Sequence, residues 1–330
     1  MSKKIISPVR HLQEISKRYK TAWRIVDELR QNRDFEDWCF LPMTAYYAII
    51  CKEHGLTELP ISLANDISDM AALGAWRVTQ GIYNFDENLS TALFDTELTS
   101  ELPCDVFYHL PEWCVYIQAS SLMFSSFKLD GFFVHLEKDT NTNEHELRLL
   151  LDVKLKDVMG IDKEENGLIP VPVHLGKWSL LEAVEKSVQV SLKNGLGLLG
   201  KITANANDFS KSLTLEISPL ISLILYLCSK NPDFSGSYPS YPTPKKTKNG
   251  MRFFPPEKPK LIQVGKEIGD TLRTFENRVS SSTNSGSKRP HIRRGHWHGY
   301  WKGKRTNDIR QFNYNWIPPT LINAEQNKAP

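Results

Sequence analysis

"ELRLLLDVKL", Glu146–Leu155, is one of four stretches in the middle of the chain that predict β-strands. The other three are "WCVYIQ" (Trp113–Gln118), "FFVHLE" (Phe132–Glu137) and "LIPVPVHL" (Leu168–Leu175). As a group they are rich in β-branched and aromatic residues, and Asn, Asp, Gly and Pro separate them, which is typical of strands joined by turns. We therefore expect a central sheet that is largely antiparallel.

The residues before this sheet are predicted to be helical. Ser7 and Pro8 supply a helix start, because serine caps and proline fits the first helical position. Apolar residues then recur at three- and four-residue steps as far as Leu29, which indicates one amphipathic helix. Two further helices are expected over Thr44–Glu53 and Ser62–Gln80.

The residues after the sheet mix helices, a proline-rich connector and a strand. Ser179-Leu-Leu-Glu182 is a capping box that predicts a helix to about Lys193. Other expected elements are helices over Leu220–Ser229 and within Leu261–Val279, a flexible linker over Ser280–Ser287, and a strand within Phe312–Asn323 that ends at Pro318-Pro319. The fold class is therefore α+β. We divide the chain into a helical region 1–90, an α+β core 91–234, a Pro/Lys-rich connector 235–260, and a basic C-terminal region 261–330 that packs on the core.

Charge is distributed unevenly along the 330 residues. The net charge is only +3, yet residues 242–310 hold 17 Lys and Arg against 5 Asp and Glu, a surplus of 12. The rest of the chain therefore carries a net charge of −9. A basic segment on an acidic body suggests an anionic partner for that segment.

Several classes of protein are disfavoured by composition. The five cysteines are odd in number and widely spaced, which favours reduced thiols in the cytosol and no zinc ribbon. The N-terminus has no long apolar core, so we expect no signal peptide. The longest apolar run, Ile217–Cys228, is shorter than the roughly 20 residues that cross a bilayer, so we expect a buried helix and no membrane partner. We expect no cofactor and no metal.

The stretch "KRPHIRRGHWHGYWKGKR" (Lys288–Arg305) combines basic, histidine and aromatic residues. If it is extended, alternation places one cationic, hydrogen-bonding face opposite one aromatic face. The first face holds Arg294, His296, His298, Tyr300 and Lys302, and the second holds Arg293, Gly295, Trp297, Gly299, Trp301 and Gly303.

Three functional interpretations of this stretch compete with a structural one. Arginines bind phosphate, and Trp and Tyr offer stacking faces to bases, which favours RNA binding. The candidate RNA-binding residues are Lys288, Arg289, His291, Arg293, Arg294, His296, Trp297, His298, Tyr300, Trp301, Lys302, Lys304 and Arg305. His296 and His298 are also weak candidates for general acid–base catalysis in a ribonuclease. A metal site at the histidines is disfavoured by the neighbouring arginines. The structural alternative is an edge strand with Trp297 and Trp301 packed on the core.

Glu146, Asp152 and Lys154 suggest a second catalytic alternative. Their spacing faintly resembles the carboxylate–carboxylate–lysine pattern of metal-dependent nucleases. A solvated acidic turn over the nearby acids is the structural alternative. If the pattern were catalytic, the protein itself would be the nuclease.

Several blocks of the sequence resemble one family of type V-A anti-CRISPR proteins, which phages, plasmids and other mobile elements carry. The blocks are "GAWRVTQGIYNFDE" (Gly74–Glu87), "LPEWCVYIQ" (Leu110–Gln118), "YLCSKNPDF" (Tyr226–Phe234), "IQVGKEIGDTLRTFEN" (Ile262–Asn277) and "KRPHIRRGHWHGYWKG" (Lys288–Gly303). They follow the family's order and span most of the chain. The resemblance implies suppression of effector production in the cytoplasm of the host bacterium. The family protein recognises the nascent N-terminal peptide of the type V-A effector, and the effector mRNA is then degraded, so the ribosome and mRNA are expected partners.

Four aromatic or basic residues are candidates for the peptide site. A helix through Trp76 that ends at Gly81 would place Trp76 and Tyr83 on one face, with Arg77 pairing an acid or a carbonyl. Pro111 before Trp113 suggests a strand start or a sheet edge, and at an edge a nascent chain could add as a strand. For each of these residues, packing in the core is the structural alternative.

Overall fold

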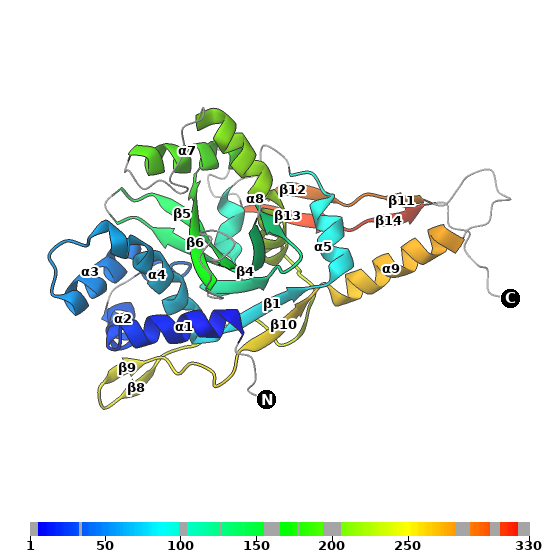
Figure 1. The fold of residues 1–330 in the computed structure, drawn as a ribbon. Helices are drawn as coiled ribbons and strands as arrows, with labels where there is room; N and C mark the ends of the chain where they lie inside the picture. The colour runs from blue at the N-terminus through cyan, green and yellow to red at the C-terminus, as the bar shows by residue number, and fades with distance from the viewer. Residues whose placement is uncertain are drawn as a thin grey trace.

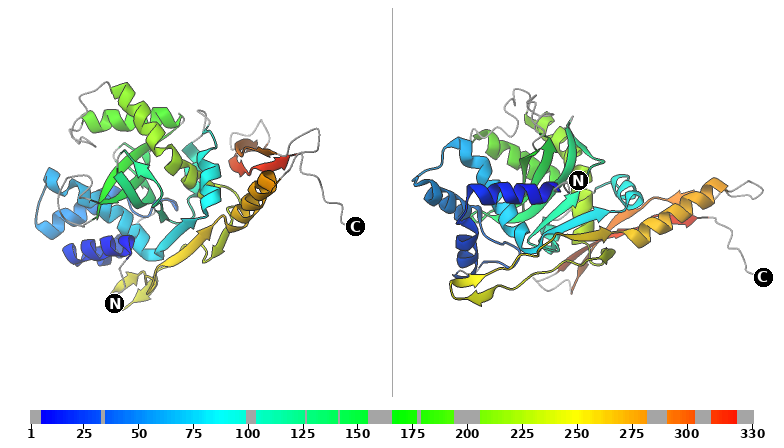
Figure 2. Two further views of the ribbon diagram at one scale, coloured as in Figure 1. Left: turned by 45° about the vertical axis from the view of Figure 1, so that its right-hand side comes forward. Right: turned by 60° about the horizontal axis from the view of Figure 1, so that its bottom comes forward.

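The computed structural model describes residues 6–32, 35–98, 104–125, 127–140, 142–154, 166–176, 179–193, 206–281, 291–303 and 311–322. They form a body, built on one sheet with helices on both faces, and an arm that projects from it (Figure 1). The arm consists of helix α9 (Lys266–Ser281) and strands β11 (His291–Arg293) and β14 (Thr320–Ile322). Both views in Figure 2 show the arm extending away from the body.

The body contains all the described helices and strands that are not part of the arm. Its helices are α1 (Ser7–Arg18), α2 (Ala22–Asn32), α3 (Met43–His54), η1 (Ile61–Leu63), α4 (Ala64–Thr79), α5 (Glu87–Phe94), η2 (Cys104–His109), α7 (Leu180–Lys193) and α8 (Ala206–Cys228). The other strands are β1 (Gly81–Phe85), β2 (Cys114–Gln118), β3 (Met123–Phe124), β4 (Phe127–Lys138), β5 (His145–Lys154), β6 (Asn166–Leu175), β7 (Phe234–Gly236), β8 (Lys245–Thr247), β9 (Gly250–Arg252), β10 (Lys260–Val264), β12 (His296–Lys302) and β13 (Gln311–Ile317).

The central sheet has eight strands in the order β6-β5-β4-β2-β1-β10-β7, with β3 paired to β4. β1 runs parallel to both β2 and β10, and the other pairs are antiparallel. The predictions of an α+β class and a largely antiparallel sheet are confirmed. The parallel centre was not predicted, because β1 and β10 are far apart in sequence.

Alternating residues of the sheet enter two separate cores. On β2, Val115 and Ile117 point into a core that α5, α7 and α8 cover. Cys114 and Tyr116 point into the opposite core, under α1 to α4. Because both faces are buried, the strands read as nearly continuous apolar runs. All five cysteines are buried thiols outside any disulfide.

The N-terminal apolar stripe is divided between two helices, where one was predicted. The chain turns after α1 at Tyr19, whose side chain is fully buried and whose hydroxyl donates to Asp66 of α4. α2 begins three residues later, at Ala22. The helix periodicity continues through the turn, so the sequence pattern alone did not reveal the break. The third predicted helix is confirmed as α4.

α8 is longer than the predicted Leu220–Ser229 helix, and Pro219 lies inside it. By length and composition alone, Asp208–Cys228 could cross a membrane. However, 61% of its most apolar window is buried inside the protein. It packs against α5, α7 and η2, and its apolar side chains share one core with the sheet, which is the behaviour of a core helix.

The two edges of the sheet are β6 and β7. β6 carries Pro170 and Pro172, and an edge strand tolerates the missing N–H donors. Of the two interpretations of Pro111, the strand start is confirmed, because β2 begins at Cys114, and the sheet edge is wrong, since β2 lies between β1 and β4. Strand addition at β2 is therefore blocked by its own neighbours.

The connector is more ordered than its proline content predicted. β8 and β9 form an antiparallel hairpin that packs on α2. Lys248 and Asn249 form the turn, and Gly250, the first residue of β9, has φ +95°. An Asn-Gly pair is a strong hairpin signal, and it could have revealed this element from the sequence.

Candidate nucleic-acid interface

The basic stretch forms one side of a two-stranded ribbon. β12 pairs with β13 in antiparallel register, from His296 opposite Ile317 to Lys302 opposite Gln311. β11 pairs with β14 in the same way, with Arg293 opposite Thr320. Pro318 and Pro319 separate β13 from β14, as the sequence predicted for the end of that strand.

The inner face of the ribbon is fixed to the body by aromatic side chains. Trp297, Tyr314 and Trp316 are buried and belong to the core under α8. Trp297 stacks on Tyr314 with ring centroids 5.0 Å apart and an angle of 8° between the planes. The indole N–H of Trp316 donates to Thr96 Oγ1 over 3.1 Å. Burial of three such rings holds the ribbon in a defined position.

The outer face of the ribbon is exposed. His296, His298, Tyr300 and Lys302 alternate along it, as predicted. The rings of His298 and Tyr300 stack with centroids 5.6 Å apart and an interplanar angle of 29°. Two stacked rings beside a lysine offer stacking and charge to the same ligand.

Trp301 departs from the prediction that it packs on the core with Trp297. Alternation places it on the side of Trp297, but its side chain is 48% exposed. The inner face is thus buried at Trp297 and exposed towards the end of β12. Two aromatic residues, Tyr300 and Trp301, are therefore accessible side by side in the sequence.

Arg293 and Arg294 are exposed where β11 ends and β12 is about to begin. Within the described parts of the chain, no carboxylate forms an ion pair with either of them or with Lys302. His291 is also exposed, on β11. Four further predicted RNA-binding residues, Lys288, Arg289, Lys304 and Arg305, lie outside the described residues. An open positive surface is therefore present.

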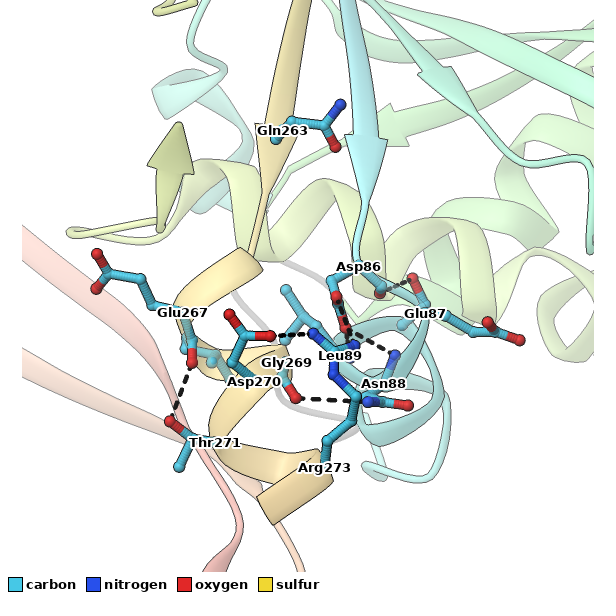
Figure 3. A network of polar contacts seen from close by, with 12 residues as sticks. Asp86, Glu87, Asn88, Leu89, Gln263, Glu267, Gly269, Asp270, Thr271 and Arg273 are labelled. Carbon is cyan, nitrogen blue, oxygen red and sulfur yellow. Dashed lines mark hydrogen bonds and ion pairs between the residues drawn. The ribbon is translucent and has the colours of Figure 1, made fainter. Parts of the chain in front are cut away.

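The arm begins at a junction of polar contacts between α5 and α9 (Figure 3). Asp86 caps α5, accepting hydrogen bonds from the N–H groups of Asn88 and Leu89. The same carboxylate binds Arg273 of α9 over 3.0 Å. Asn88 donates to the carbonyl of Gly269, where any side chain would collide with Asp86.

This junction brings together three of the sequence blocks that resemble the family. β1 pairs with β10 along all five residues, joining "GAWRVTQGIYNFDE" to "IQVGKEIGDTLRTFEN". Asp233, from "YLCSKNPDF", accepts a hydrogen bond from the Glu267 N–H over 2.8 Å and so caps α9. The blocks thus contain the residues that set the direction of the arm.

The predicted peptide residues Trp76 and Tyr83 lie on opposite sides of the sheet. Both are fully buried, Trp76 in α4 and Tyr83 on β1. The expected shared helix face is wrong, because Gln80 adopts a left-handed conformation and the chain continues from Gly81 as a strand. Trp76 donates to the Gly81 carbonyl over 2.9 Å.

Arg77 and Trp113, the other two predicted peptide residues, are also buried. Arg77 forms an ion pair with Asp27, and its guanidinium lies 5.2 Å from the ring centroid of Trp23. The indole of Trp113 donates to the Asp37 carbonyl over 2.8 Å. This geometry favours the core-packing alternative for all four residues, while their role towards a peptide stays a prediction.

The carboxylates proposed for a nuclease site have separate structural partners. Asp152 is fully buried, accepts a hydrogen bond from the Tyr116 hydroxyl and lies 3.0 Å from His11 Nε2. Glu146 lies 2.9 Å from His174 Nδ1 and pairs with Arg148. Burial alone would raise the pKa of Glu146, but Arg148 and His174 outweigh it and lower the pKa to about 2.

Distance also separates these two carboxylates. Six residues along a strand correspond to roughly 20 Å, so Asp152 and Glu146 do not share one metal ion. Lys154 is half-buried at the end of β5. Among the described residues, no group of three or more His, Cys, Asp or Glu side chains has the arrangement of a metal site.

Glu112 is a buried acid whose role the sequence analysis missed. It is 0% exposed, and its Oε1 accepts a hydrogen bond from the Ser240 N–H over 3.1 Å. Burial raises its pKa to about 7, against the opposing effect of this hydrogen bond. Gly81 is required beside it, because a side chain there would collide with the carboxylate. Glu112 therefore joins the connector to β1.

Comparison with known proteins agrees with this architecture. A model of the AcrVA2-like family, described as the anti-CRISPR type V subtype A2 family, matches residues 83–324. The crystal structure of AcrVA2 superimposes with a TM-score of 0.67 at 23% sequence identity, covering 97% of this chain and 100% of that one. No curated protein sequence matches. Since the family model spans well over half of the chain, this protein belongs to the anti-CRISPR type V subtype A2 family.

Proposed function

We propose that this anti-CRISPR protein blocks production of a type V-A effector by recognising its nascent N-terminal peptide and promoting degradation of its mRNA. In this proposal the outer face of β12, with Arg293 and Arg294, contacts RNA of the translating complex in the host cytoplasm. The peptide-reading step follows from the resemblance to the family. The single observation that supports the RNA contact is the exposed cationic and aromatic face of a ribbon whose other face is buried.

The chemistry of that face suits single-stranded RNA. Guanidinium groups give forked hydrogen bonds to phosphate, and each neutralised phosphate releases counterions. The stacked rings of His298 and Tyr300, and the exposed Trp301, provide surfaces for unpaired bases. Because the buried inner face fixes the ribbon, little ordering is needed when RNA binds.

Co-expression with the type V-A effector tests the proposal in cells. The wild-type protein is expected to lower the effector transcript, measured by quantitative PCR against an unrelated transcript. Arg293→Ala/Arg294→Ala should restore much of the effector transcript when the variant is expressed at the same level as the wild-type protein. A matched control, Lys128→Ala/Lys211→Ala, removes two exposed lysines elsewhere on the body and should behave as wild type. Unchanged effector transcript with the wild-type protein would refute the proposal.

Peptide recognition needs its own measurement. A synthetic peptide of the effector N-terminus should bind the full chain, and a scrambled peptide should not. Pull-down from translating cells, with and without RNase, then separates the two contacts. We expect the peptide contact to survive RNase and the ribosome to be lost.

Ribonuclease activity is the alternative, favoured by the placement of His296 and His298 on one exposed face. Two residues apart on a strand, they stand about 7 Å from each other, within the span of a phosphodiester and its neighbours. Purified protein with naked RNA decides this. Cleavage that His298→Ala abolishes and a chelator does not would assign catalysis to the ribbon. Steep salt-dependent RNA binding without peptide affinity or effector loss would instead favour the remaining alternative, a nucleic-acid-binding regulator that is encoded on a mobile element and has no CRISPR target.

A further inference from the structure

The β8–β9 hairpin carries a second group of exposed cations that the proposed function does not use. Lys245 pairs across the hairpin with Arg252, and Lys246 with Met251, so the two lysines occupy opposite faces. Lys248 lies in the turn. All three lysines are exposed.

The hairpin is held firmly on α2. Arg252 donates to Glu28 over 3.1 Å and to the Asn249 carbonyl over 2.7 Å. The next residue, Phe253, is buried, and its N–H donates to Asp27 over 3.2 Å. Thr247 closes the turn, with its hydroxyl bonded to the Gly250 carbonyl over 2.6 Å. The lysines thus extend from a preorganised support.

The lysines of the hairpin are not matched by nearby acids. Arg24, which is exposed on α2, lies beside the hairpin, because its carbonyl accepts a hydrogen bond from Arg252 over 3.5 Å. Glu28, the acid beside it, is already paired with Arg252. Across the described residues, no carboxylate lies within ion-pair distance of Lys245, Lys246 or Lys248. Because the chain outside residues 242–310 is acidic overall, this concentration stands out from its surroundings.

We propose that the hairpin, with Lys245, Lys246 and Lys248, is a second RNA-binding surface that contacts the phosphate backbone. It lies at the end of the molecule opposite the arm (Figures 1 and 2). The surface extends the proposed function and does not require the ribbon to bind RNA. Lysine ammonium groups act as point charges, so the contact reads phosphate without regard to sequence.

Two separated surfaces predict a dependence on RNA length. An oligonucleotide of about 10 nucleotides occupies one surface, since single sites take roughly 4–16 nucleotides. A longer strand reaches both, and the second contact is then intramolecular, which raises the affinity without any new interaction. The hairpin variant should therefore lose more affinity for a long strand than for a short one.

The test measures binding of labelled oligouridine of about 10 and about 60 nucleotides to the full chain by fluorescence anisotropy across a salt series. The hairpin variant is Lys245→Gln/Lys246→Gln/Lys248→Gln, which retains Arg252 and the anchor on α2. Each lost phosphate contact lowers the slope of log affinity against log salt by about 0.7. Three lost contacts lower the slope by about 2. If wild type and variant bind equally at 1 M salt, the variant then binds RNA about 100-fold more weakly than wild type at 0.1 M salt.

The controls separate this proposal from the function proposed for the ribbon. Lys52→Gln/Lys128→Gln/Lys211→Gln removes three exposed lysines from α3, β4 and α8 and should change the affinity less than twofold. Arg293→Ala/Arg294→Ala tests the ribbon alone. If this variant binds RNA as wild type does, RNA binding by the ribbon is contradicted, and the result for the hairpin still stands. A hairpin variant with the wild-type slope, or an equal loss in the control triple, overturns the hairpin proposal. So does tighter binding of polyglutamate than of oligouridine, which would assign the surface to an acidic protein.

Discussion

The arginines of the body and those of the ribbon occupy opposite environments. Arg77 is buried against Asp27 and Arg148 is partly buried against Glu146, so each is held by a carboxylate of the body. Arg293 and Arg294 are exposed and have no such partner in the described chain. Arg77 and the ribbon arginines all belong to blocks that resemble the family. Residue type within a block therefore does not identify function, whereas burial and pairing do.

The largest expected effect on stability comes from the buried arginine. Arg77→Ala leaves Asp27 buried without its counter-charge, and we expect the free energy of unfolding to fall by about 3–5 kcal/mol. Urea unfolding of the full chain measures it. Adding Asp27→Asn to this variant should recover part of the loss, because the lone charge is removed. A change below about 1 kcal/mol would mean that the pair is less buried than the contacts indicate.

A smaller effect, limited by pH, is expected at Glu112. Its pKa rises from 4.5 to about 7 on folding, so the folded state holds the proton more tightly than the unfolded state. The resulting stabilisation is complete below pH 4.5 and is lost as the pH rises to 7, a difference of up to roughly 3 kcal/mol.

The comparison of Glu112→Gln with wild type isolates this contribution. Burial also raises the pKa of Asp69 to about 7, but that group titrates in both proteins. The difference between the two curves of unfolding free energy against pH should therefore fall between pH 4.5 and 7. For Glu257→Gln, at an exposed position, the curve of unfolding free energy against pH should be parallel to that of wild type. Parallel curves for Glu112→Gln would contradict the prediction.

The junction between the body and the arm should show a modest and local effect. Asp86→Ala removes both the cap of α5 and the ion pair to Arg273, with an expected cost of about 1–2 kcal/mol. Hydrogen exchange should accelerate in α9 more than in the central strands. Asp86→Asn keeps the capping oxygen and should show about half of the effect. Unaltered exchange in α9 would show that other contacts set the position of the arm.

The smallest expected effect on stability is at the ribbon. Arg293→Ala/Arg294→Ala should change the free energy of unfolding by no more than about 0.5 kcal/mol, because both side chains are exposed and form no ion pair with a described residue. The same variant should lower the salt slope of RNA binding by about 1.4. Differential scanning calorimetry beside the anisotropy assay tests both statements. A large loss of stability would mean that these arginines contribute to folding, as Arg77 does, and would contradict the prediction.

Local patterns were sufficient for much of the fold. The strands at Trp113, Phe132 and Glu146 were predicted because apolar residues on both faces and turn residues between them mark buried strands. The Ser179 capping box was confirmed, since the Ser179 N–H donates to Glu182 Oε2 over 2.6 Å and the Glu182 N–H lies 3.3 Å from Ser179 Oγ. Such features depend only on residues that are close in sequence, so the sequence is sufficient to predict them.

Long-range pairing was not predictable in the same way. The role of Gly81–Phe85 as a central strand depends on β10, about 180 positions further along the chain, and on the space that Gly81 leaves for Glu112. At the interface, alternation correctly placed Trp297 inside and His298 outside. It could not show that the body ends before Trp301, because that depends on which elements lie beneath the ribbon.

The prolines of β6 affect how readily molecules of this protein associate through the edge of the sheet. Pro170 and Pro172 are two positions apart, so both would direct an N–H towards the open edge if they were other residues. A second molecule approaching that edge meets carbonyl groups but lacks the donors needed to continue the ladder. Assembly into fibrils through this side is thereby suppressed.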